Sequence, residues 1–186
     1  FAFMLRDLGN AGSAKGGIGG ALPHIDTSRN LSMYRSLTAA MQERLVASAH
    51  DCSDGGFSVA LAECCFGANA GAKIDISPMY SDAPKSIGQK PSNNTLPEHD
   101  NPTSENLPLD IWGVLFGESL GRILVSVRPD RAEEFEAAMD GHACHRLGSV
   151  VAGDEIRISI GDEPALIASM SQLRTSWKAT LDGGRE

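Results

Sequence analysis

The sequence predicts an α/β domain, on the border of α/β and α+β, in which helices flank a mixed sheet. Two observations support this prediction. Segments with apolar residues at helical spacing alternate with shorter segments of strand character, such as residues 71–76 and 122–127. A polar, glycine-containing loop also lies between a predicted strand and the helix that follows it, and such loops commonly carry the ligand chemistry of α/β layers.

Residues 1–26 are rich in glycine, and we expect them to be irregular. A flexible segment is favoured over a phosphate-cradling loop, because no helix start follows the glycines directly. The rest of the chain, residues 27–186, is predicted to form one domain. Its first element is an amphipathic helix with capping side chains at residues 26–28. The expected inward face of this helix consists of Leu31, Tyr34, Leu37, Met41 and Leu45.

Residues 46–49 predict a short buried strand that leads into the polar loop, and an apolar helix is expected from residue 57 to Gly67. Residues 77–110 interrupt this pattern, because they contain six of the nine prolines and few large apolar residues. Such a segment cannot bury enough surface to offset the entropy lost on ordering. We expect a disordered insertion within the domain, since helical and strand patterns resume after it.

The second half of the chain predicts a buried strand at residues 122–127 and a helix from Pro129 to Met139. Residues 145–151 and 155–160 predict a β-hairpin around a Gly-Asp turn. Residues 169–172 match a capping box at the start of a last helix. Leu173, Trp177 and Leu181 are expected to face the core from that helix.

Composition narrows the classes of partner and compartment. The chain has 186 residues, a net charge of −8 and a pI near 5.1, which argue against nucleic acid and anionic membrane surfaces as partners. No apolar run approaches the roughly 20 residues that span a bilayer. The four cysteines lack CxxC spacing, so a reducing, cytoplasmic environment is expected. Because the chain begins at Phe1 and not at a methionine, we expect it to be a piece of a longer protein.

The polar loop carries the residue types that bind phosphate and divalent metal. Asp51 and Asp54 supply hard oxygen ligands of the kind that Mg²⁺ prefers. Ser53 adds a hydroxyl group for a phosphate oxygen, while Gly55 and Gly56 leave the backbone open at the start of a helix. A Mg-nucleotide or a phosphorylated substrate is therefore one prediction for this loop.

A purely structural role explains the same loop equally well from composition. In that alternative Asp51 or Ser53 caps the helix with its side chain and the next residues form a turn. His50 is a secondary site candidate, although a packed and hydrogen-bonded histidine is the favoured interpretation. Glu118 is another secondary candidate, because a Gly-Glu-Ser turn brings its carboxylate to the start of a strand. Its alternative is a carboxylate bonded to backbone or paired with Arg122.

Several strings resemble the phosphoribosylformylglycinamidine synthase family in order and spacing. They are HDCSDGG at residues 50–56, VALAE at 59–63, GAKIDI at 71–76, LFGES at 115–119 and RILVSV at 122–127. The resemblance is to the carboxy-terminal domain of that enzyme, of the aminoimidazole ribonucleotide synthase-related type. It covers nearly the whole chain apart from the proline-rich insertion.

The resemblance implies an ATP-dependent carbon–nitrogen ligase of purine biosynthesis. This enzyme makes formylglycinamidine ribonucleotide from formylglycinamide ribonucleotide and glutamine-derived ammonia. By this resemblance Asp51 is a Mg²⁺ ligand and Ser53 contacts the nucleotide, ATP or ADP, with Asp54, Gly55 and Gly56 as supports of the loop. The catalytic residues are expected outside this chain, so the domain alone should be inactive.

The partners that the resemblance implies are the amino-terminal domains of the same enzyme and, in a short form, a glutaminase subunit and a small accessory subunit. Two alternatives stay open. One is another ATP-dependent kinase or synthase, such as aminoimidazole ribonucleotide synthase, selenophosphate synthetase or thiamine-monophosphate kinase; the HDCSDGG string argues against it. The other is a nucleotide-binding half-domain that stabilises an assembly without catalysis.

Overall fold

The computed structural model describes residues 2–5, 25–81 and 111–181. No helix in these ranges is both long and apolar enough to cross a membrane. The elements in chain order are β1 (Ala2–Leu5), α1 (Thr27–Gln42), β2 (Val46–Asp51), α2 (Gly56–Ala68), β3 (Gly71–Asp75), α3 (Pro78–Ser81), α4 (Ile111–Phe116), β4 (Ile123–Val127), the 3₁₀ turn Pro129–Arg131, α5 (Ala132–Ala138), β5 (Cys144–Val151), β6 (Glu155–Ile160), β7 (Glu163–Ser169) and α6 (Met170–Leu181).

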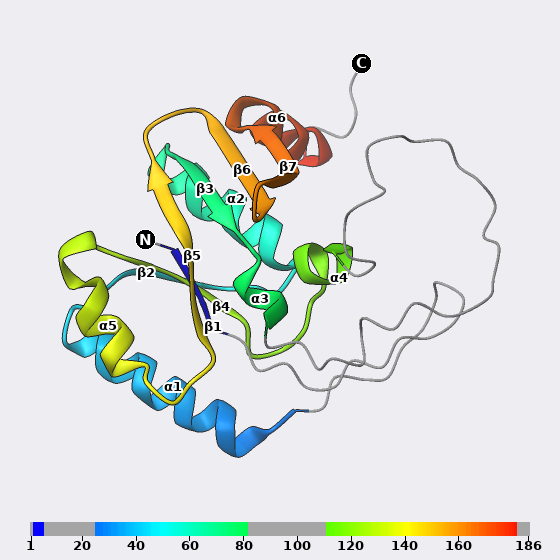
Figure 1. Ribbon diagram of the computed structural model, residues 1–186. Coiled ribbons are helices and arrows are strands. Elements are labelled where there is room, and N and C mark those ends of the chain that lie inside the picture. Colours follow the sequence, from blue (N-terminus) through cyan, green and yellow to red (C-terminus); the bar gives the residue numbers. More distant parts are fainter. Residues whose placement is uncertain (1, 6–24, 82–110, 182–186) are drawn as a thin grey trace.

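One seven-stranded sheet organises these elements (Figure 1). Its strand order is β2-β4-β1-β5-β3-β6-β7. Strands β3 and β6 run parallel, and the other neighbouring pairs run antiparallel. The architecture is therefore the mixed α/β sheet with flanking helices that the sequence predicts.

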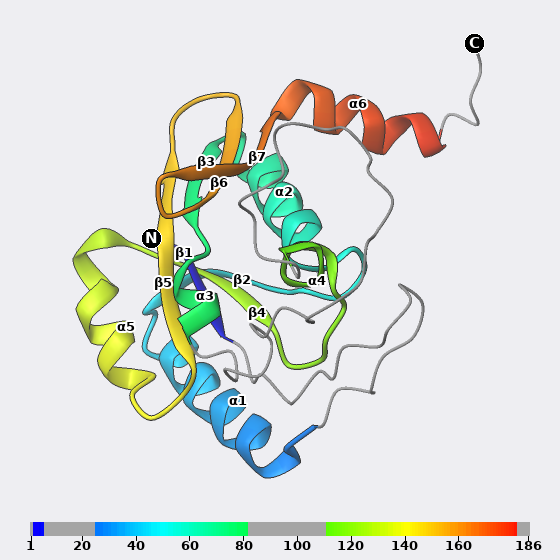
Figure 2. The same cartoon turned by 45° about the vertical axis from the view of Figure 1, so that its right-hand side comes forward.

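Helices cover both faces of the sheet (Figure 2). Leu124 and Val125 are neighbours on β4, and successive side chains of a strand point to opposite faces. Leu124 belongs to the core cluster formed with α2 and α4, whereas Val125 belongs to the cluster formed with α1 and α5. The sheet thus separates two cores, and the polar loop lies at the start of α2 on the side of the first.

Two predictions about the early strands require correction. Strand β2 is real and extends to Asp51, but it is mostly exposed because it is an edge strand that pairs with β4. Residues 2–5 lie in the segment expected to be irregular, yet they form β1 between β4 and β5. The remainder of the glycine-rich prediction, apart from residues 25 and 26, lies outside the described residues.

The predicted hairpin of residues 145–151 with 155–160 is wrong. Strand β3 lies between β5 and β6, and β6 pairs instead with β7, which the sequence analysis missed. At Gly148 an added Cβ would lie 2.0 Å from the backbone oxygen of Lys73, so the absence of a side chain permits this close approach of β3. Two successive strand patterns and a turn do not specify which strands pair.

The start of the predicted insertion is also ordered. Residues 78–81 form the short helix α3, and the side chain of Met79 is buried in the first core. Residues 82–110, on which the prediction of disorder mainly falls, lie outside the described residues. Regular structure therefore continues to residue 81, past the predicted start of the insertion at residue 77.

Two helix faces differ from the prediction. In α1 the buried residues are Asn30, Met33, Leu37 and Ala40, whereas Leu31, Tyr34 and Met41 are exposed. The two stripes have the same helical spacing and differ by one residue, so spacing alone did not separate them. The last helix begins with the predicted capping box between Ser169 and Gln172, but Trp177 is 53% exposed.

Candidate functional site

The loop between β2 and α2 is a tight turn whose polar side chains face outward. Cys52 is buried, and its backbone N–H donates to the carbonyl of Arg122 at 2.9 Å. The N–H of Gly56 donates to the carbonyl of Ser53 at 3.2 Å, which closes the turn. Ser53 and Asp54 between these contacts are exposed, so both side chains are accessible to a ligand.

Glu118 meets this loop in space. The backbone N–H of Gly55 donates to its carboxylate oxygen Oε1 at 2.9 Å. Arg122 is not the partner of Glu118, because its guanidinium donates to the carbonyl groups of Gly117 and Val114. Of the alternatives for Glu118, the structure shows the carboxylate bonded to backbone.

Both glycines of the loop are explained by packing within the chain. Gly55 has a φ of 74° and Gly56 a φ of 68°, values in the left-handed region that favours glycine. An added Cβ on Gly56 would lie 2.6 Å from the carbonyl carbon of Phe116. Gly56 therefore permits the close approach of α2 to the end of α4, a reason the sequence analysis did not anticipate.

The side-chain cap considered for the helix is not observed. Gly55 occupies the N-cap position of α2, and the start of α2 has no side-chain cap hydrogen bond. The alternative in which Asp51 or Ser53 caps the helix with its side chain is therefore wrong. Because neither the Asp51 nor the Ser53 side chain caps α2, capping does not prevent either of them from contacting a ligand.

Asp51 and His50 lie at the end of β2. The side chain of Asp51 is 74% exposed. His50 Nδ1 lies 2.6 Å from the carbonyl oxygen of Asp51, and its Nε2 lies 3.2 Å from the carboxylate of Glu63. His50 is thus hydrogen-bonded, in line with the favoured interpretation, and its use as a site residue stays a prediction.

The described residues contain no group of three or more His, Cys, Asp and Glu side chains able to hold a metal ion. Among these residues, Asp51 is therefore not part of a preformed set of three such ligands. The donor type fits, because an exposed carboxylate is a hard oxygen ligand.

Burial raises the pKa of the neighbouring Cys52 thiol to about 11, although the charge of Arg122 lowers it, so Cys52 is a neutral thiol.

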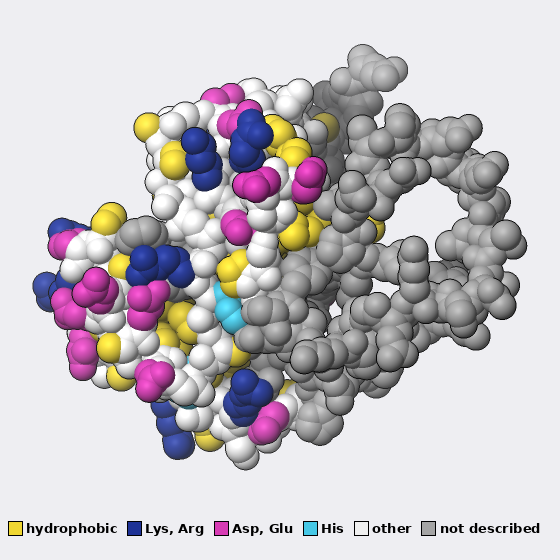
Figure 3. All heavy atoms as spheres, in the orientation of Figure 1, with side chains coloured by type: hydrophobic (Ala, Val, Ile, Leu, Met, Phe, Trp, Pro, Cys, Tyr) yellow, Lys and Arg dark blue, Asp and Glu magenta, His cyan; other side chains and the backbone are white. Residues whose placement is uncertain are grey.

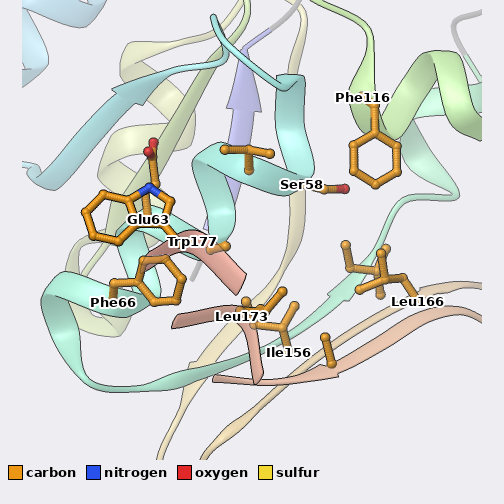
Figure 4. Close-up of a pocket in the computed structure, with 12 residues that line it drawn as sticks. Ser58, Glu63, Phe66, Phe116, Ile156, Leu166, Leu173 and Trp177 are labelled. Carbon is orange, nitrogen blue, oxygen red and sulfur yellow. The ribbon is translucent and has the colours of Figure 1, made fainter. Parts of the chain in front are cut away.

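An apolar pocket of about 230 Å³ opens along α2, between Ser58 and Phe66 (Figure 4). Phe66 and Trp177 lie together on one side of it and Phe116 on another, with Ser58 and Glu63 as its polar members. The lining suits an apolar group and not a phosphate. Sequence analysis missed the pocket because its walls come from α2, α4, β6, β7 and α6, which are distant in sequence.

Charges on one face of the molecule are mixed. Lys and Arg side chains alternate there with Asp and Glu over the described surface (Figure 3). Such a mixed surface creates no strong field of one sign.

Comparison with known proteins identifies the family. Residues 6–161 match the family described as AIR synthase related protein, C-terminal domain. The chain belongs to this family. Among curated members of comparable sequence, the phosphoribosylformylglycinamidine synthase subunit PurL of Salinibacter ruber is 36% identical over 165 residues, covering 87% of this chain and 18% of that protein. The PurL subunit of Anaeromyxobacter sp. is 32% identical over 158 residues, covering 84% of this chain and 18% of that subunit.

Solved structures agree with the AIR synthase-related fold. Thermotoga maritima PurL complexed with ATP has a TM-score of 0.62 at 16% identity, covering 92% of this chain and 25% of that one. The hydrogenase maturation protein HypE in complex with ATP has a TM-score of 0.55 at 12% identity, covering 90% of this chain and 50% of that one. At these identities the likeness shows the fold. The chain spans about a fifth of the length of its curated PurL relatives.

Proposed function

We propose that this AIR synthase-related domain is the carboxy-terminal part of a phosphoribosylformylglycinamidine synthase. The observation that carries the proposal is the HDCSDGG loop, whose backbone N–H groups make three hydrogen bonds, two of them to Arg122 and Glu118 outside the loop, while Ser53 and Asp54 remain exposed. The curated relatives that match this chain include PurL subunits at 27% and 36% identity. The likeness to HypE rests on the fold alone, so a different ATP-dependent member of the superfamily is disfavoured.

In this function the loop binds the phosphate end of a nucleotide. The Ser53 hydroxyl donates to a phosphate oxygen, and the Asp51 carboxylate holds Mg²⁺. Asp54 supports the turn, Gly55 accepts no side chain because of its φ, and Glu118 holds the Gly55 N–H. When bound, Mg²⁺ neutralises phosphate charge during transfer of a phosphoryl group to the amide oxygen of the substrate.

Because the loop carries carboxylates, we expect nucleotide binding to depend on a metal ion. Asp51 and Asp54 are exposed on the loop, and the exposed carboxylate of Glu118 accepts from its Gly55 N–H. Carboxylates repel a polyphosphate unless a cation lies between them. The nucleotide therefore binds as its Mg²⁺ complex.

The complete reaction requires the other domains of the enzyme. This chain contributes one wall of a composite site, and the catalytic groups belong to the amino-terminal domains. The solved structures that share this fold include PurLQS from Thermotoga maritima and T. maritima PurL complexed with FGAR. A glutaminase subunit and a small subunit are thus proposed partners, with a formylglycinamide ribonucleotide as substrate. The four free cysteines fit a reducing cytoplasm.

Titration calorimetry with ADP tests the nucleotide site. We expect the chain to bind ADP with Mg²⁺ present and to lose binding when EDTA removes the metal. Asp51→Asn should weaken the affinity about tenfold or more, because a neutral amide is a poorer Mg²⁺ ligand. Asp140→Asn is the matched control, since Asp140 is also exposed but lies after α5, outside the loop.

Equal ADP affinities for the Asp51→Asn and Asp140→Asn variants would exclude Asp51 as the ligand. If neither this chain nor the enzyme with its amino-terminal domains restored binds Mg-ADP, the nucleotide function of the loop is wrong. Activity of the isolated chain would contradict the composite site.

A further inference from the structure

Arg122 is a buried cation next to the loop. Its side chain is 2% exposed, and no ion pair found among the described residues includes it. Nη1 and Nη2 donate to the carbonyl groups of Gly117 and Val114, each at 2.6 Å. The third guanidinium nitrogen, Nε, is buried without a partner. Burial of a cation without a carboxylate partner costs folding free energy, which the two carbonyl contacts only partly offset. We therefore expect these two contacts to have a role beyond global stability.

The hydrogen bonds of Arg122 lie at both ends of the loop. Its own backbone carbonyl accepts from the N–H of Cys52, where the loop begins. Its guanidinium holds the carbonyl of Gly117, and the adjacent Glu118 accepts from the N–H of Gly55, where the loop ends. Arg122 therefore contacts Cys52 at the start of the loop directly, and it contacts the end of the loop indirectly, through the Gly117-Glu118 turn.

The same turn forms the surface against which α2 begins. A Cβ on Gly56 would meet Phe116 and Gly117 backbone atoms at 2.6 and 2.7 Å. A shift of that backbone by a few tenths of an ångström would be transmitted to the start of α2, because packed backbone segments have no free space between them. Clamping of Gly117 by Arg122 therefore limits the conformations available to the loop.

We propose that Arg122 is a positioning residue of the loop: it fixes the end of α4 so that Ser53 and Asp54 are held in one conformation before a ligand arrives. A preordered loop loses less conformational entropy on binding and binds more tightly. The value of this order for nucleotide affinity rests on the proposed function. The order of the loop itself does not depend on it.

A purely structural arginine would act on the whole domain, and matched variants separate the two roles. Arg122→Met keeps the length and apolar stem but removes both donors. Arg122→Lys keeps the charge and restores at most one of the two carbonyl contacts. Arg174→Met is the control, because Arg174 also donates to a helical carbonyl of α2, that of Phe66 at 3.0 Å, but at the far end of the helix.

The experiment is backbone hydrogen exchange by mass spectrometry on the full chain, with urea unfolding to measure global stability. Arg122→Met should speed exchange of residues 52–58 about tenfold relative to the rest of the sheet, since lost charge-assisted hydrogen bonds open the segment that they held. Arg122→Lys should give a smaller increase. Arg174→Met should speed exchange near residues 66–70 and leave residues 52–58 unchanged.

Unchanged exchange in residues 52–58, or an increase of equal size across the whole chain, would overturn the positioning role. If Arg122→Met does not fold, Arg122→Lys decides by the same comparison. Mg-ADP titration is run in parallel, and Arg122→Met should weaken binding about tenfold with it. Absence of Mg-ADP binding by the wild-type chain would count against the proposed function, while the exchange data would still decide the role of Arg122.

Discussion

Replacement of Gly56 by alanine tests the contact between α2 and α4 directly. A left-handed φ of 68° costs a non-glycine residue about 1–2 kcal/mol. The new methyl group would also lie 2.6 Å from a backbone carbon of Phe116, and relief of such overpacking costs about 1–3 kcal/mol. We therefore expect Gly56→Ala to lower the free energy of unfolding by about 3 kcal/mol.

Gly67→Ala in the same helix is the control. No heavy atom lies within 4 Å of the position that its Cβ would take, and its φ is not in the left-handed region. Alanine should therefore raise helix stability by about 0.5–1 kcal/mol. Urea unfolding followed by circular dichroism measures both changes. If Gly56→Ala proves as stable as Gly67→Ala, the close approach of α2 and α4 is not a real constraint.

Two further predictions concern single contacts. Burial raises the pKa of the Asp75 carboxyl, but hydrogen bonds from Ser77 and from the Gly161 N–H lower it by more, so its pKa lies below the ordinary 3.8. The ionised form is then favoured by folding: its stabilisation is complete above pH 3.8 and is lost as the pH falls through the lowered pKa. The stability difference between wild type and Asp75→Asn, followed by urea unfolding, should shrink on acidification, and a constant difference would contradict this. Ser169→Ala removes the hydroxyl that accepts from the Gln172 N–H at 3.2 Å, which should cost about 1 kcal/mol in thermal unfolding, whereas Ser171→Ala should cost less.

Local chemistry was predictable where it is written in consecutive residues. The capping box of α6 needs residues 169 and 172, and the loop string needs residues 50–56, so both were found from sequence. The strand at residues 122–127 and the helix after Pro129 also have patterns that span few residues. The mixed sheet follows from such segments because each must bury one face.

Contacts between distant segments were not predictable. The pairing of β3 between β5 and β6, the hold of Arg122 on Gly117 and the pocket walls each depend on which elements become neighbours. Both glycines of the loop were noticed, but the close contact that requires Gly56 is with Phe116 at the end of α4, which is distant in sequence. In the sequence Arg122 appears only as a single arginine before an apolar strand. Its structural role became visible only when the structure showed that it is buried.

The place of β1 has a consequence for how the domain folds and for where it can be cut. Residues 2–5 pair with β4 on one side and β5 on the other, more than 100 residues away along the chain. Such distant pairing slows folding, because a long loop must close before the contacts form. A truncation past residue 5 would also leave the facing edges of β4 and β5 unpaired in the middle of the sheet, where exposed edges invite aggregation. A short first strand thus joins the two halves of the sheet, and expression boundaries should be chosen to keep it.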